Sequence, residues 1–542
     1  MKKTAITALL FLALIACQAL EQLPLNLKSW SFVGGPGATT IKDGTVQLEQ
    51  KESASKEFIA FSKSAAAGEG YYVLRGQFKG LSDGAAGVAS LVGRTDSNGW
   101  IRDWRTPLLT ATDWQDFELR LFVEDNCAFF QLQLEAHQGK VCFRHLTLEK
   151  TDPSEGVSTD APDMEFWINM DFLDDIDYTY NIRHVERYDE KAIAEYFKLC
   201  RERGVTGVLW RISALGQMMH HTKVGVRYPA LRTCALSKRD LATKSILDEF
   251  DPPVAAIREA RRNGIKLYLW MTLCDESYTS DENEGGQINN SQFLLDNPTC
   301  ELLDRKGNQL HGTICYNEPA ARAYRLAVLK ELLDYGADGI YLCNRTHSTV
   351  FGVDNDADYG FNPSVVAEYK KRYNVDILTE DYDPEKFKAI KAEGYNQLIK
   401  EASEMVHAAG QKLMLGVSFW GVSTGRVGAN YGKMSVDIAG YLRNGWIDAI
   451  VSGQNNVGPY FAAAEIAAFR QNARPGQKFY YWAQMVDYAG GRVYPVEDLI
   501  KQAQFFNFYG ANGAMYHESI NFEEHDAPEK YFKPIAKFYE EH

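Results

Sequence analysis

The chain has 542 residues, of which 45% are hydrophobic, and this is enough to bury two substantial cores. Its net charge of −14 argues against nucleic acid and against anionic membrane surfaces as partners. The nine cysteines form no Cys-x-x-Cys pair, so a structural zinc site is not expected. We expect neither a metal nor a cofactor, and the sequence does not predict an oligomeric state.

The chain begins with a basic residue pair and an apolar stretch, Ala5–Ala16, which is too short to span a bilayer. The ending Leu14–Cys17 resembles the lipobox of bacterial lipoproteins, in which the cysteine is acylated. That resemblance implies a signal peptide over 1–17, a lipid anchor on Cys17 and a place in the cell envelope. Gln18 is not the aspartate of an inner-membrane retention signal, so the outer membrane is favoured. An ordinary signal peptide with a chance cysteine is the alternative.

Residues 25–149 consist of short runs of alternating apolar and polar residues between Gly, Asp and Ser clusters, which predicts an all-β sandwich. The stretch 112–117 and the runs 129–134 and 141–148 resemble the C-terminal half of jelly-roll carbohydrate-binding modules of families four and nine. The resemblance implies a glycan-binding domain, and a domain that only packs on its neighbour is the alternative. Exposed aromatic rings stack on the apolar faces of sugars, and the candidates for this contact are Trp100 and Trp104.

Two cysteines of this region, Cys127 and Cys142, fall on or beside predicted strands and could pair in an oxidising compartment. Residues 150–163 follow as a linker, because they are rich in Pro, Gly and Ser and have almost no apolar content.

Glycine punctuates the remainder, 164–542, in a regular way. Seven predicted helices end at a glycine, and a short apolar run begins within a few residues of each. With the run 165–172 before the first helix, this predicts eight strands alternating with helices, the α/β order of a (β/α)8 TIM barrel. The expected strands are 165–172, 206–212, 266–273, 339–343, 413–419, 449–453, 479–485 and 513–516.

Long connections leave several of these strands, at 213–251, 275–318 and 344–362, whereas the connections that enter strands are short. Long loops on one end of a barrel are expected where that end holds the active site. Asn169 and Asp171 follow the first strand, and aromatic, amide and charged residues follow the others. The candidates for substrate binding are Trp210, Arg211, Trp270, Asn344, Arg345, Trp420, Gln454, Trp482, Asp487 and His517.

Four segments carry a family resemblance: 267–276, 297–307, 316–320 and 335–345. They resemble the uncharacterised family-ten-like glycosyl hydrolases, a group often found as bacterial lipoproteins, and the likeness spans about residues 165–520. The resemblance implies a barrel and, by analogy of fold, hydrolysis of a glycosidic bond. One departure is clear. The barrel glycosidases of the largest clan carry their acid/base carboxylate after strand four. Here that strand is followed by Asn344 and Arg345, and the first carboxylate comes only at Asp354.

Glycoside cleavage usually needs two carboxylates on either side of the scissile bond. Strand ends eight and three are as far apart around the ring as strand ends four and seven, so Glu518 can face Asp275 or Glu276 across a similar span. We therefore expect Glu518, with Asp275 or Glu276, to be catalytic. Solvated loop charges for the pair, and helix capping or an ion pair for Glu518, are the alternatives.

Two further patterns are weaker. The acids from Asp354 to Asp358 alternate as in a calcium loop, but they lack its glycine and its final glutamate. His220 and His221 have no partner at metal-ligand spacing.

The sequence therefore predicts a lipid-anchored glycoside hydrolase that acts on a polysaccharide or oligosaccharide by carboxylate acid/base catalysis. A non-catalytic glycan-binding lipoprotein with a degenerate barrel is the alternative, favoured by the missing carboxylate after strand four. A barrel lyase or deacetylase would need a base or metal cluster that the sequence does not show.

Overall fold

The computed structural model describes residues 21–541 except 24, 35–36, 51–57, 67, 98, 107, 124–126, 152–163, 182–187, 215, 230–235, 280–287, 345–357, 418–420, 426–433, 435, 454–458, 488–491 and 518–527. Contacts divide the chain into two units, Met1–Val157 and Ser158–His542. In the described part, no helix has both the length and the apolar character that crossing a membrane requires.

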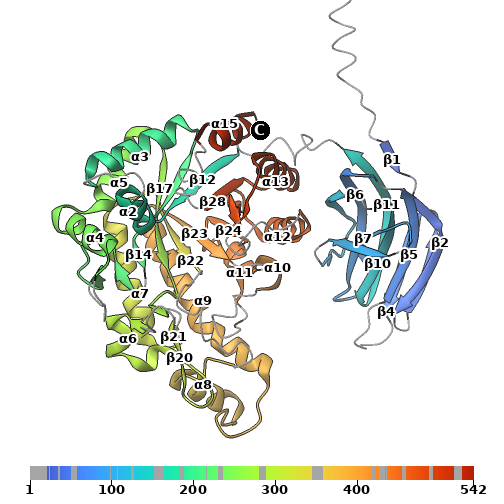
Figure 1. Ribbon diagram of the computed structural model, residues 1–542. Coiled ribbons are helices and arrows are strands. Elements are labelled where there is room, and N and C mark those ends of the chain that lie inside the picture. The colour runs from blue at the N-terminus through green and yellow to red at the C-terminus, as the bar shows by residue number, and fades with distance from the viewer. Residues whose placement is uncertain are drawn as a thin grey trace, which may run out of the picture. The chain divides into compact units, whose positions relative to one another are not determined.

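Two antiparallel sheets form the N-terminal unit (Figure 1). One has the strand order β3-β4-β11-β6-β9 with β1 on β11, and the other has the order β2-β5-β10-β7-β8. The rings of Tyr72 on β6 and Phe130 on β10 lie 5.4 Å apart and connect the two sheets. The unit is all-β as predicted, while its jelly-roll character stays a prediction. The strands are β1 (Glu21–Leu23), β2 (Leu25–Gly34), β3 (Gly37–Lys42), β4 (Thr45–Gln50), β5 (Phe58–Ala66), β6 (Gly70–Gly80), β7 (Ala86–Arg94), β8 (Trp100–Arg105), β9 (Gln115–Val123), β10 (Phe129–Gln138) and β11 (Lys140–Thr151).

Two expectations for this unit are corrected by the structure. Trp104 is 3% exposed and packs edge-on against Phe130 with the ring centroids 6.0 Å apart, so it is a core residue and not a sugar platform. The side chain of Trp100 lies outside the described part. Cys127 and Cys142 are both buried free thiols. They are not paired in this structure: the Cys127 thiol donates to the carbonyl of Phe129, and the Cys142 thiol, on β11, lies 3.9 Å from Oε1 of Gln47.

The C-terminal unit contains a closed barrel of eight parallel strands in the order β12-β13-β17-β22-β23-β24-β25-β28. The predicted (β/α)8 barrel is confirmed, and each predicted strand is present to within about two residues. The strands are β12 (Glu165–Met170), β13 (Gly207–Arg211), β17 (Lys266–Thr272), β22 (Gly339–Cys343), β23 (Lys412–Val417), β24 (Ala449–Ser452), β25 (Lys478–Gln484) and β28 (Gly513–His517).

The glycine punctuation has the expected cause. All seven junction glycines adopt positive φ angles, and Gly264 is one example, with a φ of 68° and a ψ of 24° as the left-handed cap of its helix. A side chain at such a residue is strained, so glycine marks the point where the chain leaves the helix and enters the next strand.

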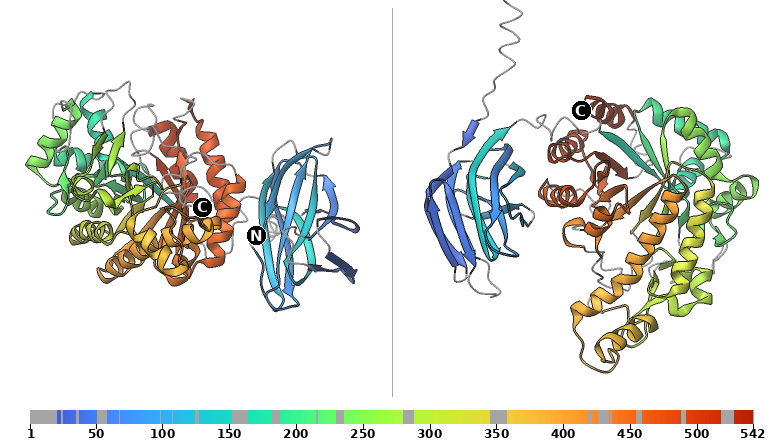
Figure 2. Two further views of the ribbon diagram at one scale, coloured as in Figure 1. Left: turned by 90° about the horizontal axis from the view of Figure 1, so that it is seen from below. Right: turned by 180° about the vertical axis from the view of Figure 1, so that it is seen from behind.

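Helices surround the parallel strands in Figures 1 and 2. The two clearest predicted helices are observed as α3 (Glu190–Glu202) and α7 (Pro319–Asp334). The others are α2 (Phe172–Asn181), α4 (Lys238–Glu249), α5 (Pro252–Asn263), α6 (Gln292–Asp296), α8 (Pro363–Tyr373), α9 (Pro384–Ala408), α10 (Gly421–Thr424), α11 (Ile438–Asn444), α12 (Pro459–Asn472), α13 (Val496–Tyr509) and α15 (Lys533–Glu541).

The long connections contain secondary structure of their own. The connection after β13 contains β14 (Ser213–Ala214), β15 (Gln217–Met218), β16 (Val226–Arg227) and helix α4. The connection after β17 contains two hairpins, β18 (Ser277–Thr279) with β19 (Ile288–Asn290) and β20 (Glu301–Leu303) with β21 (Gln309–Ile314). A last hairpin, β26 (Val486–Asp487) with β27 (Arg492–Val493), follows β25.

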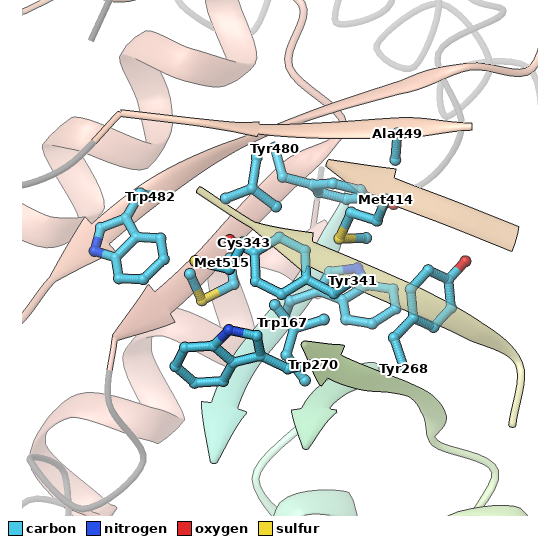
Figure 3. Close-up of a cluster of buried hydrophobic side chains, with 12 residues drawn as sticks. Trp167, Tyr268, Trp270, Tyr341, Cys343, Met414, Ala449, Tyr480, Trp482 and Met515 are labelled. Atoms are coloured by element: carbon cyan, nitrogen blue, oxygen red, sulfur yellow. The ribbon is translucent and has the colours of Figure 1, made fainter. Parts of the chain in front are cut away.

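Every second residue of the barrel strands points inward and is buried. The inward residues form one core, which includes Trp167, Trp270, Tyr341, Trp482 and Met515 (Figure 3). Side chains therefore fill the barrel, as in other folds of this kind, and a ligand can enter only at its ends.

Candidate functional site

Polar side chains continue the inward-facing rows at the carboxyl ends of three adjacent strands. Asn169 lies two residues after Trp167, Arg211 two after Leu209, and His517 two after Met515. Because side chains alternate between the two faces of a strand, these three face the carboxyl end of the barrel interior. We call this end the mouth.

Arg211 is the central charge of the mouth. It is 4% exposed, and its two terminal nitrogens donate to different carboxylates: Nη1 to Asp171, and Nη2 to Asp275 at 2.9 Å. Its Nε donates to the carbonyl of Ser213 at 2.9 Å. Burial acts to lower the pKa of Arg211, but the two carboxylates outweigh it and raise the pKa. Among the described residues, Arg211 therefore gives the mouth a permanent cation that two acids share.

Trp270 lies beneath this cluster. Its ring centroid is 5.1 Å from the Arg211 guanidinium carbon, and the residue is 2% exposed. Its indole Nε1 is buried and has no hydrogen-bond partner within the described residues. Buried N–H groups are normally paired, so this one is available to donate to a group that the described residues do not supply, such as a ligand hydroxyl.

A second polar pair lies on the neighbouring strands. Nδ1 of His517 on β28 is 2.9 Å from Nδ2 of Asn169 on β12, and both residues are buried. The His517 ring lies 4.7 Å from the Trp482 ring of β25. The described polar groups thus form an arc over strands β25, β28, β12, β13 and β17, which includes the strand ends eight and three that the sequence pointed to.

The structure separates the two adjacent acids that the sequence proposed as alternatives. Asp275 is at the mouth, while Glu276 points away from it and pairs with the buried Arg325 of α7. The backbone of Glu276 also bonds to both sides, with its N–H to Gly312 and its carbonyl from Ser291. Glu276 therefore attaches the loop after β17 to the helix layer.

Trp210 is also placed away from the mouth. It is fully buried, stacks on Phe197 at 6.0 Å and lies 5.6 Å from Phe172. Both neighbours are on helices, so Trp210 fills the layer between the strands and the helices. Its Nε1 also lacks a partner in the described part, but it is remote from the barrel interior. This position is that of a core tryptophan.

The structure describes the side chains of only some of the remaining residues predicted from the sequence. Asn344 is 7% exposed and accepts a hydrogen bond from Tyr395 of α9, which orients its side chain. Asp487 pairs through its backbone with Arg492 in a hairpin, and its side chain is not described. Five predicted residues lie outside the described residues: Cys17, Arg345, Trp420, Gln454 and Glu518.

The list of candidates omitted Asn169 and Asp171, although both were noted at the end of the first strand. Asp171 follows the first strand directly, and Asp275 comes three residues after the third, so a position just past a barrel strand was the available signal. Its pairing with Arg211 could not be read from the sequence, because the two residues are 40 positions apart.

The structure describes part of the two weaker metal-like patterns, the acids of 354–358 and the histidine pair. Asp358 pairs with Lys391 at 2.7 Å, whereas Asp354 and Asp356 lie outside the described residues. His220 is fully buried and lies 3.7 Å from the Glu331 carboxylate, and burial lowers its pKa. Within the described ranges, no group of three or more His, Cys, Asp or Glu residues is placed to hold a metal ion.

No protein-family model matches the chain, and no curated protein matches it. Among solved structures, it is similar to the glycoside hydrolase domain of PgaB (BpsB) from Bordetella bronchiseptica, with 13% identity over 67% of this chain and 96% of that chain and a TM-score of 0.45. It is also similar to the CBM22-1–GH10 modules of xylanase Xyn10B from Clostridium thermocellum, complexed with xylohexaose, with 11% identity over 91% and 89% of the two chains and a TM-score of 0.30.

Other solved structures match a smaller share of the chain. One is the family 11 carbohydrate-binding module from Clostridium thermocellum in complex with a β-1,3-1,4-mixed-linked tetrasaccharide, with 9% identity over 23% of this chain and 94% of that chain and a TM-score of 0.21. All three TM-scores are below 0.5, so the assignment of the barrel depends on its own strand pairing.

Proposed function

We propose that this chain is a glycoside hydrolase, anchored to the outer membrane through an acylated Cys17, that acts on a polysaccharide or oligosaccharide. One observation carries the proposal: a buried Asp171–Arg211–Asp275 cluster lies against Trp270 at the carboxyl end of a closed barrel. In enzymes of this fold the active site lies at this end. Carboxylates beside an aromatic ring are the groups that sugar binding and glycoside cleavage use.

In the proposed reaction, Glu518 and Asp275 share the work. One acid gives its proton to the glycosidic oxygen, and the other carboxylate activates water or attacks the anomeric carbon, so that water is added across the broken bond. Asp275 suits the second role, because its contact with Arg211 stabilises a carboxylate. Glu518 takes the first role. Glu276 is not proposed as the partner, because Arg325 binds it away from the mouth.

A non-catalytic glycan-binding lipoprotein is the second candidate, and the same cluster favours it. Both described carboxylates at the mouth bind a single arginine. Acids that serve only to pair with an arginine could help to hold a sugar, but they would not protonate a leaving group. On either proposal, the N-terminal sheets act as a carbohydrate-binding accessory domain.

The test is a screen of the purified chain, without residues 1–17, against a panel of soluble xylan, mixed-linkage β-glucan, mannan and chitosan. Release of reducing ends measures cleavage, and retardation in polysaccharide gels measures binding. We expect cleavage of at least one polymer and a loss of at least ~10²-fold for Glu518→Gln and for Asp275→Asn.

Asp171→Asn is the matched control, because it removes the other acid from the same arginine. We expect it to retain more activity than Asp275→Asn at an equal loss of thermal stability. Retardation without cleavage would select the binding protein, and neither result on any polymer would contradict both candidates.

A further inference from the structure

The base of the β20–β21 hairpin holds two cysteines in opposite positions. Cys300 directly precedes β20, and Cys315 directly follows β21. Glu301 and Ile314 form the outermost cross-strand pair of the hairpin, so the two cysteines occupy the next pair of positions. The N–H of Cys315 donates to the carbonyl of Cys300 at 2.6 Å, which extends the antiparallel ladder to this pair.

These positions give the backbone separation that a disulfide requires. Opposite residues that are hydrogen-bonded in an antiparallel ladder have Cα atoms about 5.5 Å apart. The Cα atoms of disulfide-bonded cysteines are usually about 4.4–6.8 Å apart. Opposite residues also direct their side chains to the same face of the ladder. A bond between the two sulfurs is therefore compatible with the backbone of the hairpin.

The surroundings of the two thiols agree with this geometry. Cys300 is 2% exposed and Cys315 is 3% exposed. Backbone N–H groups at the start of α7 and just before it point at both sulfurs: that of Ala321 at Cys300, and those of Asn317 and Glu318 at Cys315. Burial, with a further contribution from the neighbouring Cys300, raises the pKa of the Cys315 thiol to about 12. The two sulfurs therefore lie near each other on one side of the hairpin.

We propose that Cys300 and Cys315 form a disulfide that closes the base of the β20–β21 hairpin when the chain folds in an oxidising compartment. Both are free thiols in the structure, so the bond requires an oxidant, and this oxidant is the disulfide of a small molecule or of a thiol–disulfide oxidoreductase.

The reaction is thiol–disulfide exchange in two steps. One cysteine thiolate attacks the oxidant's disulfide and releases a thiol, and the second cysteine then attacks the mixed disulfide and releases another. The two cysteines lose two protons and two electrons, and the oxidant's disulfide becomes two thiols. Because the thiols of the folded chain are buried and protonated, the exchange takes place before the hairpin packs.

The disulfide braces a hairpin to which the loop after β17 is attached. The N–H of Glu276 donates to the carbonyl of Gly312 on β21 at 3.0 Å, and the N–H of Gly312 donates to Oε1 of Glu301 at 2.6 Å. Closing a loop of about 15 residues restricts the open states of this hairpin. The disulfide is independent of the proposed function, because it involves no residue of the proposed site.

The experiment refolds the purified chain, without residues 1–17, in a mixture of reduced and oxidised glutathione. Iodoacetamide then blocks the remaining thiols, and trypsin with a glutamyl endopeptidase cuts the unreduced chain. Glu276 and Glu284 lie between Cys274 and Cys300, so cleavage after them separates these two cysteines. Cleavage after Arg305 separates Cys300 from the peptide that contains position 315. Linked peptides are then identified by mass.

We expect the link between Cys300 and Cys315 to be at least about tenfold more abundant than any other pair. Cys200→Ser is the matched control, since it removes another buried thiol, on α3, and should leave this link intact.

Hydrogen exchange measures the effect of the bond on the hairpin. We expect the amides of 301–314 to exchange at least about tenfold more slowly in the chain refolded with glutathione than in the chain refolded with dithiothreitol. Cys300→Ser should show no such difference, because it cannot form the bond.

The predicted link, with slower exchange at 301–314 in the wild type and not in Cys300→Ser, supports the inference. Alkylation of both Cys300 and Cys315 in the refolded chain overturns it, and a link without an effect on exchange overturns the bracing of the hairpin. If the chain does not refold, it is secreted behind a standard signal peptide into an oxidising cell envelope and digested in the same way. The same two results, a link or two alkylated thiols, then decide.

Discussion

At the scale of single residues, position on a strand decides what a side chain does. Trp210 and Arg211 are neighbours, yet one fills the layer under the helices and the other carries the charge at the mouth. Asp275 and Glu276 divide in the same way, one toward Arg211 and the other toward Arg325. Residue type at a strand end therefore does not establish a role at the site until the direction of the side chain is known.

Trp270 and Trp210 are both buried, but the same substitution by phenylalanine should affect ligand affinity only at Trp270. Trp270→Phe keeps a ring under Arg211 but removes the indole N–H that has no partner in the described chain. We expect ligand affinity to fall about five- to tenfold, on the order of 1 kcal/mol, in addition to a loss of stability from the smaller ring in the barrel core.

Trp210→Phe is the matched control for that change. It should lower the free energy of unfolding by about 1–3 kcal/mol and leave affinity unchanged, because the smaller ring packs less well against Phe197 and Phe172. Gel retardation and urea unfolding of both variants test the assignment, which fails if the two substitutions have equal effects on affinity.

At the scale of elements, the two ends of the barrel are built for different purposes. The end opposite the mouth contains Glu165, which accepts hydrogen bonds from Lys266 at 2.9 Å and from Tyr480 at 2.8 Å, and which also pairs with Lys478. These contacts join β12 to β17 and β25 across the barrel. The contacts of Glu165 therefore stabilise the barrel, whereas ligand binding in this fold takes place at the other end.

Glu165 makes this stability depend on pH. Burial raises its pKa, but Lys478 and Lys266 lower it more, and the net result is a shift from 4.5 to about 2. A lowered folded-state pKa stabilises the ionised form, so the contribution is fully present above pH 4.5 and is lost as the pH falls toward 2. The shift corresponds to a contribution on the order of 3 kcal/mol.

We therefore expect Glu165→Gln to destabilise the chain at pH 7 and the difference from wild type to shrink as the pH falls from 4.5 toward 2. Urea unfolding at several pH values measures this difference. Glu202→Gln, which changes an exposed glutamate, is the control and should show no such trend. A difference that stays constant through this range would contradict the role of the Glu165 charge.

At the scale of the whole molecule, the chain consists of two units with different sheet architectures. Antiparallel sheets form the first and a closed parallel barrel the second, and the division falls within the Pro- and Ser-rich residues 150–163. The proposed anchor, Cys17, precedes the first described strand, β1. A tether at that end would hold both units at one membrane surface while the mouth takes part of a polymer.

The anchor prediction is tested by fractionation. Cys17→Ala removes the thiol that acylation requires, so we expect the protein to move from the membrane fraction to the soluble fraction of the envelope. Ser29→Ala, a small change that leaves the lipobox intact, is the control. If the alanine variant at Cys17 stays in the membrane fraction, lipidation is not the anchor.

The order of the elements could be predicted from the sequence because its signals are local. A glycine after a helix adopts positive φ whatever the rest of the chain does, and an apolar run after it forms the next strand. The strand bounds around Gly264 and Gly336 follow from those residues alone. One signal of the same kind was missed: Ser237 and Asp240 cap α4 reciprocally, and their spacing marks a helix inside what reads as a long loop.

The content of the site depended on the tertiary structure. Parallel barrel strands are buried on both faces, so they show no alternation of apolar and polar residues from which the inward face could be read. A shift of one residue exchanges the two faces, and with them Arg211 for Trp210. Asp275 and Glu276 follow β17 in a loop, whose course the sequence does not give. Only the closure of the barrel, which brings β12, β13 and β17 side by side, places Asp171 and Asp275 on the same arginine.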